Sequence, residues 1–350
     1  MTEIVLHATA AGSTLDASAH MTPVVLRGST GDDRLVGGAV ADRIAGNFGH
    51  NEVFAGAGND QIHAILSPLA YDQIDGGSGT DSVYITLNGD QYTPSVRLAL
   101  SALKTFVTST VVEDPAAHFT NATLHLDLVG VERAFIRLDG VVTNLASFSL
   151  PEATHADPPA SDVTVHATDA LYDFAGTVSG LGATAPVSVD LGTGTGRVVT
   201  ISDVAGGFSF GHGMMATGPD GSDLYAGAGT AINPTAGLAG LVAHSNGMLV
   251  GVFLDGHEHD AGHIAPATLD FTSLGEVFGS LAPAIDQPFF IGDGLDATGH
   301  VQAFLAPDAA RTLVLGVVDG TGFHDAPGAY DDNTGFVTAH VVVQDKVWAD

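Results

Sequence analysis

The chain has 350 residues, enough for two domains of ordinary size. Its 40 Asp and Glu residues outnumber its 10 Lys and Arg residues, so the formal net charge at pH 7 is -30. Nucleic acids and anionic membranes require basic patches that so acidic a chain lacks, and we expect neither as a partner. Hard divalent cations such as Ca²⁺, which prefer clustered oxygen ligands, are the expected counterions.

Composition also bears on the location of the protein. The chain contains no cysteine, so a secreted form would depend on core burial or metal rather than on disulfides. The opening segment MTEIVLHATAAGS has neither a basic n-region nor a long apolar h-region, so no classical signal peptide is expected. No unbroken run of about 18 apolar residues predicts a membrane span, and we expect no membrane insertion. Taken alone, these features favour the cytoplasm.

Residues 28–84 carry a nine-residue register of glycines. Four consecutive blocks read GSTGDDRLV, GGAVADRIA, GNFGHNEVF and AGAGNDQIH, and after three further residues the phase resumes as SPLAYDQID and GGSGTDSVY. Each block has an aliphatic residue eighth. The sixth residues are Asp33, Asp42, Asn51, Asp60, Asp72 and Asp81. The pattern resembles the RTX nonapeptide family, whose consensus is G-G-x-G-x-D-x-U-x.

That resemblance implies a parallel β-roll whose turns bind Ca²⁺ through these six residues. Glycines permit positive φ and close approach of turns, and the aspartates with nearby carbonyls supply oxygen ligands. Turns two apart face the same side, so Asp33 should share a calcium with the turn around Asn51, and Asp42 with that around Asp60. Without metal the stacked carboxylates repel, and the roll should be disordered. The family also implies type I secretion and an extracellular or cell-surface location.

Residues 1–150 are therefore expected to form the roll and a capping region. The segments SVYITL, ATLHLDLV, ERAFIRL and ASFSL predict further strands, and SVRLALSALKTFVTS predicts one helix that helps to cover the edge of the roll. The Pro-, Ala- and Asp-rich stretch 151–161 predicts a linker.

Residues 162–350 alternate short β-rich segments with Gly, Asp and Pro turns, which favours an antiparallel β-sandwich or jelly roll. The predicted strands are DVTVHAT, RVVTISD, GGFSFG, GMLVGVFL, PFFIG, VQAFLA, TLVLGVV and GFVTAHVVV. The whole chain is thus expected to be all-β.

The loop HDAPGAYDDNTG, at 324–335, gathers several side-chain and main-chain oxygens, as a calcium site requires. An ordinary Asp/Asn-rich hairpin would have the same composition. The loop resembles the calcium loop of galactose-binding lectins of the LecA (PA-IL) type, N-D-x-P-G-x-Y-x-N-N-x-G. DVTVHATDALYDFAGTV, GGFSFG with GPDGSD, and GMLVGVFL with PFFIG and TLVLGVVDG fit other parts of that family in order, so the resemblance covers about 162–343.

The lectin resemblance implies a calcium whose remaining coordination positions are filled by vicinal sugar hydroxyls. Its implied metal ligands are Phe210 and Ala329 through their carbonyls, and Asp325, Asp332 and Asn333 through their side chains. The last three are also the implied carbohydrate-binding residues. The family's His-Pro-x-Gln segment is replaced by DLYAGAG at 223–229, and Ala329 lacks a hydroxyl, so a preference for galactose is left open.

A histidine cluster, HEHDAGH at 257–263, is the one feature that could suggest a zinc enzyme. His259 and His263 would share a face on a helix, but Gly256 and Gly262 favour a solvated loop within an insertion at about 255–286. The chain has no P-loop, and we do not expect an enzyme.

The sequence thus predicts an exported bacterial protein that binds carbohydrate in a calcium-dependent way, acting as a lectin or adhesin. Because one such site binds modestly, a homo-oligomer or surface array would add avidity. The alternative is a calcium-ordered protein of a surface layer or matrix with no sugar ligand, and the lesser alternative is a secreted zinc hydrolase.

Overall fold

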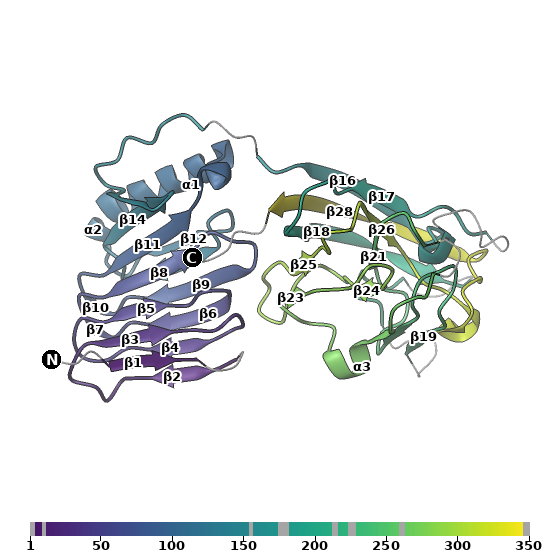
Figure 1. The fold of residues 1–350 in the computed structure, drawn as a ribbon, viewed down its shortest axis with the longest axis horizontal. Coiled ribbons are helices and arrows are strands. Elements are labelled where there is room, and N and C mark those ends of the chain that lie inside the picture. The colour runs from purple at the N-terminus through teal and green to yellow at the C-terminus, as the bar shows by residue number, and fades with distance from the viewer. Residues whose placement is uncertain are drawn as a thin grey trace. The chain divides into compact units, whose positions relative to one another are not determined.

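The computed structural model describes residues 4–8, 12–153, 157–173, 182–211, 216–222, 229–258 and 263–345. Contacts divide the chain into two compact units, Met1–Asp157 and Pro158–Asp345, both built mainly of strands (Figure 1). The all-β fold class is confirmed. The division falls inside 151–161, the segment whose composition predicts a linker.

The first unit is a β-roll of two sheets that the chain visits alternately. One sheet contains, in order, β1 (Ile4–His7), β3 (Val24–Arg27), β5 (Arg43–Ala45), β8 (Gln61–Ile65), β11 (Ser82–Leu87), β14 (Arg133–Leu138) and β15 (Val141–Asn144). The other contains β12 (His118–Asn121), β13 (Leu126–Val129), β9 (Ala70–Asp75), β6 (Gly49–Phe54), β4 (Arg34–Val36) and β2 (Thr14–Asp16). All pairs are parallel except β14 with β15 and β12 with β13.

The aliphatic eighth residue of each nonapeptide block points into the roll, as the pattern predicts. Leu35, Val53 and Ile74 stand opposite one another in one sheet, and Ile44, Ile62 and Val83 do so in the other. All six are at most 2% exposed. Burial of each such side chain stabilises the fold by about 1.5–3 kcal/mol, so the period of the sequence becomes the period of the core.

The roll extends beyond the glycine blocks at both ends. Strands β1 to β3 precede the first complete block, and β13 and β14 continue the sheets after a helical excursion. Two short strands within the turns, β7 (Ala57–Gly58) and β10 (Ser78–Gly79), also pair in parallel. The segment ASFSL, at 146–150, is not a strand, so that prediction is wrong. A turn follows β15 at this point, and Leu145 and Phe148 pack on the core without a partner strand.

The predicted helix is present as α1 (Pro94–Thr105), a π-helical turn (Phe106–Thr110) and α2 (Val111–Glu113), preceded by a 3-10 turn (Gly89–Gln91). Pro94 stands at the first helical position after Thr93, whose hydroxyl caps the helix. The inward residues Val96, Leu100 and Leu103 belong to the core of the roll. Over Pro94–Glu113 the helix has the length and mean hydropathy of a membrane span, which is weak evidence for a single helix with a buried face.

The second unit is a sandwich of two sheets that share one core. The first contains β16 (Ala160–His166), β28 (Asn333–Asp345), β18 (Arg197–Phe210), β25 (Ala303–Leu305) and β23 (Ser280–Leu281). The second contains β17 (Val187–Asp190), β26 (Thr312–Gly316), β21 (Val250–Leu254) and β24 (Phe289–Phe290), all antiparallel. RVVTISD and GGFSFG are two halves of β18, joined across a bulge between Ser202 and Ala205.

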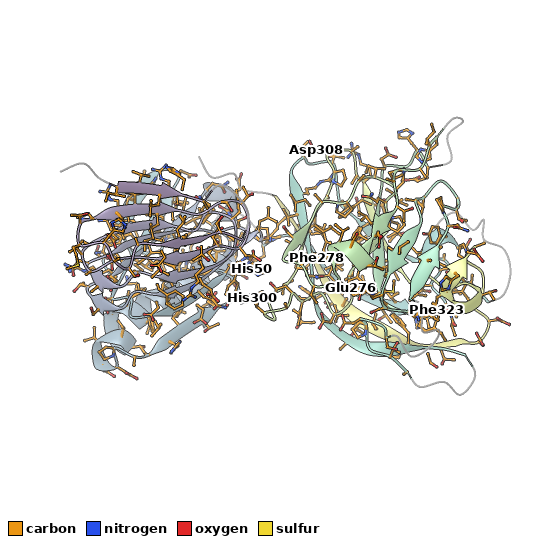
Figure 2. The ribbon with its side chains drawn as sticks, turned by 90° about the horizontal axis from the view of Figure 1, so that it is seen from below. His50, Glu276, Phe278, His300, Asp308 and Phe323 are labelled. Carbon is orange, nitrogen blue, oxygen red and sulfur yellow. The ribbon has the colours of Figure 1, made fainter. Side chains whose placement is uncertain are left out.

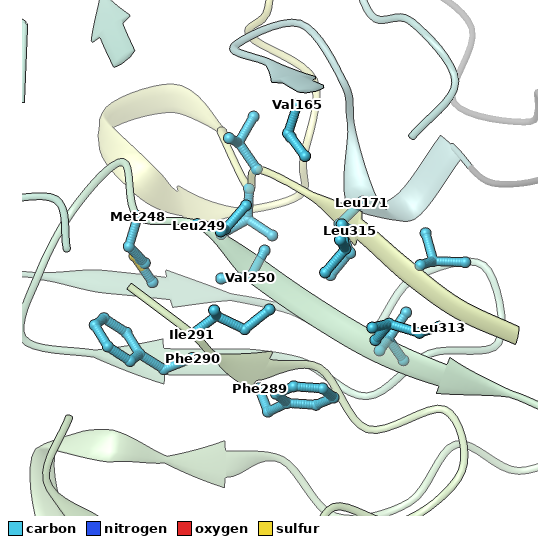
Figure 3. Packing of buried hydrophobic residues seen from close by; sticks show 14 of the residues in the cluster. Val165, Leu171, Met248, Leu249, Val250, Phe289, Phe290, Ile291, Leu313 and Leu315 are labelled. Atoms are coloured by element: carbon cyan, nitrogen blue, oxygen red, sulfur yellow. The ribbon is translucent and has the colours of Figure 1, made fainter. Parts of the chain in front are cut away.

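A smaller sheet stands beside the sandwich. It contains β22 (Leu269–Asp270), β20 (Leu241–Ala243), β19 (Thr230–Ile232) and β27 (His324–Asp325). The helical turns of this unit are Leu171–Asp173, α3 (Phe271–Leu274) and Thr321–Phe323. Figure 3 shows part of the shared core, where side chains from β16, β21, β24 and β26 meet. The core fixes the end of β18 against the start of β28, into which the predicted lectin loop leads.

Candidate calcium sites

The sixth residues of alternate blocks form a ladder along one side of the roll. Asp42 Oδ1 accepts a hydrogen bond from Val24 N at 2.8 Å, and Asp60 Oδ1 accepts one from Asp42 N at 2.7 Å. Asp81 Oδ1 accepts from Asp60 N at 2.7 Å, and Glu132 Oε2 accepts from Asp81 N at 2.7 Å. We call this series the acidic ladder. Its pairing of Asp42 with Asp60 is the one that the turn spacing predicts.

A second series, the mixed ladder, joins Asp33, Asn51 and Asp72. Asp33 N donates to Asn51 Oδ1 at 3.0 Å, and Asn51 Nδ2 donates to Asp72 Oδ1 at 2.9 Å. Both polar atoms of the Asn51 side chain are therefore engaged with neighbouring turns. The three residues between blocks, 64–66, change only the spacing of this ladder. They lengthen β8, so Asn51 and Asp72 are 21 residues apart, whereas Asp33 and Asn51 are 18 apart.

Two carboxylate oxygens of the acidic ladder have no hydrogen-bond donor in the described part of the chain. Asp60 Oδ2 and Asp81 Oδ2 are buried and unpartnered, and both residues are 0% exposed. Burial raises the pKa of Asp60 to about 6 and that of Asp81 to about 7, and the neighbouring carboxylates Asp42 and Glu132 add to these shifts. Burial also raises the pKa of Asp72 to about 7. A buried carboxylate oxygen without a donor is a position where a cation replaces the lost hydration.

Backbone carbonyls converge on the same turns because the glycines let stacked turns touch. A Cβ on Gly79 would lie 1.5 Å from Gly58 O, and one on Gly77 would lie 2.0 Å from Gly56 O. Both glycines also have positive φ, of 143° and 82°. Carboxylate and carbonyl oxygens together make the donor set that Ca²⁺ prefers, so the residues present fit the ion.

Glu132 takes the ladder position where the next aspartate would stand, and the sequence pattern does not identify it. It lies 51 residues beyond Asp81, after the helical excursion and outside the nine-residue phase. Its place directly before β14, as the first residue of the segment ERAFIRL, is the only signal for this role in the sequence.

In the second unit, the structure pairs two of the residues implied as lectin ligands. Phe210, at the end of β18, stands opposite Asn333, the first residue of β28. The Phe210 ring packs edge-on against Phe323, with centroids 5.3 Å apart; Figure 2 labels Phe323. Asn333 is 6% exposed, its Nδ2 donates to Ala167 O at 3.1 Å, and its Oδ1 is buried with no partner among the residues that the structure describes.

Asp319 joins this pair and is absent from the residues that the sequence points to. It is 5% exposed, and burial raises its pKa to about 7, an effect to which Asp332 and Asp331 add and which the Asn333 side chain partly offsets. Its N–H donates to the hydroxyl of Tyr330 at 3.2 Å. The sequence signal that could have identified Asp319 is its place directly after the apolar segment TLVLGVV.

The other implied ligands lie on the loop between these residues. Asp325 is exposed, has a φ of 64°, and accepts a hydrogen bond from Asn233 N at 2.8 Å through its main-chain carbonyl. Ala329 and Asp332 are half-buried. Among described residues, the group that meets in the structure is thus Phe210, Asp319 and Asn333, with Asp332 near it. The roles of all these residues as ligands stay predictions.

The histidine cluster is only partly within the described residues. His259 lies outside them, as do 223–228, the place of the altered sugar segment. His257 and Glu258 lie three and four residues after the end of β21 and do not enter a helix, and His263 begins the next described segment. His263 Nε2 is 2.9 Å from Gly237 O. Because a carbonyl only accepts, this nitrogen carries the proton and does not ligate a metal.

Comparison with known families supports the repeat. Residues 26–62 match the family model for the RTX calcium-binding nonapeptide repeat, in four copies. The repeat is a calcium-binding motif, and Ca²⁺ is the cofactor of this region. Such repeats are typical of proteins that leave the cell by type I secretion, consistent with an extracellular location. A search of curated proteins and a search of solved structures each found no match.

Proposed function

We propose that this chain is an exported bacterial protein that binds carbohydrate through a calcium ion held by residues 319–333 of the second unit, and that it is not an enzyme. The observation that carries the proposal is the buried, unpartnered Oδ1 of Asn333 beside Phe210 and Asp319. A buried amide oxygen without a donor costs about 1–3 kcal/mol unless something occupies it, and a calcium ion does so.

The loop also offers groups that could face a ligand. The exposed carboxylate of Asp325 and the half-buried one of Asp332 are within the same loop as Asn333. Carboxylates orient sugar hydroxyls through charge-assisted hydrogen bonds, while vicinal hydroxyls fill open positions on calcium. The aliphatic Ala329 contributes only a carbonyl, which leaves room for sugars other than galactose.

The roll has a separate part in this proposal. Its calcium would be taken up outside the cell, where the ion is abundant, so that the acidic ladder orders after export by type I secretion. Binding in this picture is weak at one site, and oligomers or surface arrays supply the avidity needed for adhesion.

The test is calorimetric titration of the calcium-loaded full chain with galactose and then other monosaccharides, repeated in chelator. We expect calcium-dependent heat with at least one sugar. Asp325→Asn, which retains the tolerance of an Asx residue for positive φ, should weaken that binding at least about tenfold, since hydrogen bonds to charged groups contribute about 1.5–3 kcal/mol. Asp203→Asn is the matched control, because Asp203 is also exposed and has a similar φ, 52° against 64°, but lies outside the loop 319–333, and it should leave the binding unchanged.

Two outcomes would overturn the proposal. Calcium binding without any sugar response would favour a calcium-ordered structural protein of a surface layer or matrix. Sugar binding that survives chelation, or that is equally weakened by Asp325→Asn and Asp203→Asn, would remove the calcium loop from the binding site.

A further inference from the structure

An acidic cluster lies in the second unit outside the loop 319–333, within the insertion between β21 and β24. Asp255 directly follows β21, Glu258 comes three residues later, and Asp286 lies shortly before β24. One carboxylate oxygen from each lies within 4.8 Å of the other two. Two separate segments of chain therefore bring three carboxylates to one point.

Asp286 is the most constrained member of this cluster. It is 2% exposed, its N–H donates to Phe253 O at 2.9 Å, and its carbonyl accepts from Ala239 N at 2.8 Å. Its Oδ2 is 3.2 Å from His263 Nε2, whereas its Oδ1 is buried with no hydrogen-bond partner. A buried carboxylate thus turns one oxygen to a histidine and leaves the other without a donor among the described residues.

The remaining carboxylates are also held in place by the backbone. Glu258 is 6% exposed, and its Oε1 accepts from Gly256 N at 3.0 Å. Asp255 Oδ1 accepts from His257 N at 2.9 Å. Gly237 permits the approach of this segment, because a Cβ there would lie 2.2 Å from Glu258 O. Each of these carboxylates keeps a second oxygen for another ligand.

Charge within the cluster is unbalanced. Burial raises the pKa of Asp286 to about 6, the charge of Glu258 adds to this rise, and His263 opposes it. Within the part of the chain that the structure describes, three carboxylates face the one imidazole of His263, so the ionised cluster is disfavoured without a further cation. His263 Nε2 donates its proton to Gly237 O and lies 3.2 Å from Asp286 Oδ2, so among the described residues the ligand atoms that the cluster offers are carboxylate oxygens. An all-oxygen set selects a hard cation over zinc.

We propose that Asp255, Glu258 and Asp286 bind one Ca²⁺ ion, with His263 as a positioning residue that fixes the Asp286 carboxylate. The site is independent of the proposed carbohydrate-binding calcium and of the calcium ions in the roll. Its ion would tie the start of the insertion, at the end of β21, to the end of the insertion before β24.

The test counts calcium ions bound to the chelator-stripped full chain by equilibrium dialysis with metal analysis. Asp286→Asn should bind one ion fewer per chain than the wild type. Asp203→Asn is the matched control, because Asp203 shares the positive φ of Asp286, 52° against 62°, but is exposed, and it should bind the wild-type number. Glu258→Gln, which keeps the acceptor for Gly256 N, should also lose one ion and decides the test if Asp286→Asn does not fold.

Thermal unfolding separates metal binding from a purely structural role. In chelator, Asp286→Asn should be as stable as the wild type or more stable, because the change removes a buried negative charge. Adding calcium should raise the thermal midpoint of Asp286→Asn by less than that of the wild type. A wild-type ion count in both Asp286→Asn and Glu258→Gln would overturn the proposal. So would equal destabilisation of Asp286→Asn in chelator and calcium, or stoichiometric zinc in the site when both metals are offered.

Discussion

Asp60→Asn should make the calcium-free protein more stable than the wild type and the calcium-loaded protein less stable than the wild type. Asp60 Oδ1 accepts a hydrogen bond from Asp42 N at 2.7 Å, and an asparagine keeps this acceptor, as Asn51 does for Asp33 N at 3.0 Å in the mixed ladder. The substitution removes the charge of the buried carboxylate, whose Oδ2 has no donor.

The magnitude follows from burial. Asp60 is 0% exposed, and burial raises its pKa from 3.8 to about 6. At about 1.36 kcal/mol per pH unit, the ionised carboxylate costs the folded, calcium-free roll up to roughly 3 kcal/mol at neutral pH. Because solvent near the turns screens part of this cost, Asp60→Asn should stabilise the calcium-free roll by about 1–3 kcal/mol. Calcium at about 100-fold over its Kd adds about 2.7 kcal/mol per site, and at 1,000-fold about 4.1. The variant should lose this gain at its site, so the wild type becomes the more stable form as calcium saturates.

Urea unfolding with hydrogen-exchange mass spectrometry, read on peptides from 28–85, reports the roll separately from the second unit. Asp139→Asn is the control, because Asp139 likewise accepts one backbone N–H, from Gly89 at 2.8 Å, but is exposed. It should be neutral in both conditions. The reasoning fails if Asp60→Asn is less stable than the wild type in chelator, or if both proteins gain equally from calcium.

Two further predictions concern the turns. Gly79→Ala should destabilise the calcium-loaded roll by more than about 3 kcal/mol, because its Cβ would collide with Gly58 O. Gly140 has a φ of 81° and nothing lies within 4 Å of where its Cβ would stand, so Gly140→Ala should cost about 1 kcal/mol. If Gly79→Ala and Gly140→Ala lost similar free energies of unfolding in urea, the close stacking of the turns would be contradicted. Because burial raises the pKa of Asp72 and of Asp81 to about 7, the calcium-free roll keeps protons that the unfolded chain releases, and its stability should fall as pH rises from about 4 to about 7. Saturating calcium should reverse this slope, since the ion needs ionised ligands, and thermal midpoints with the same slope in both conditions would refute the assignment.

The roll was predictable because its information is local and periodic. A residue such as Ile62 or Asp60 has its orientation fixed by its place in a nine-residue block, and the stacked partner lies a fixed number of residues away. Even the three residues between blocks only change the partner distance from 18 to 21. The repeat therefore predicts both the buried aliphatic positions and the ladder of carboxylates.

The remaining features depend on pairings that no local pattern encodes. Strands β1 to β3 lack the glycine blocks and are strands of the roll only because later turns stack on them. Glu132 reaches Asp81 across 51 residues, and Asn333 meets Phe210 through the long pairing of β18 with β28. Asp319 and Asp286 look like ordinary loop aspartates in the sequence, and only burial in the folded unit distinguishes them.

The acidic ladder should depend on calcium more strongly than the mixed ladder does. In the mixed ladder, Asn51 accepts a hydrogen bond from Asp33 N with its amide oxygen and donates one to Asp72 Oδ1 with its amide nitrogen, so a neutral group satisfies the Asp72 carboxylate in part without metal. In the acidic ladder, no side-chain amide stands between the carboxylates of Asp60 and Asp81, and each keeps one oxygen without a donor among the described residues. Since an unpaired buried charge costs more than a satisfied one, the acidic side should open first when calcium is withdrawn. The imperfect block at Asn51 thus preserves structure on one side of the roll and leaves the response to calcium to the other.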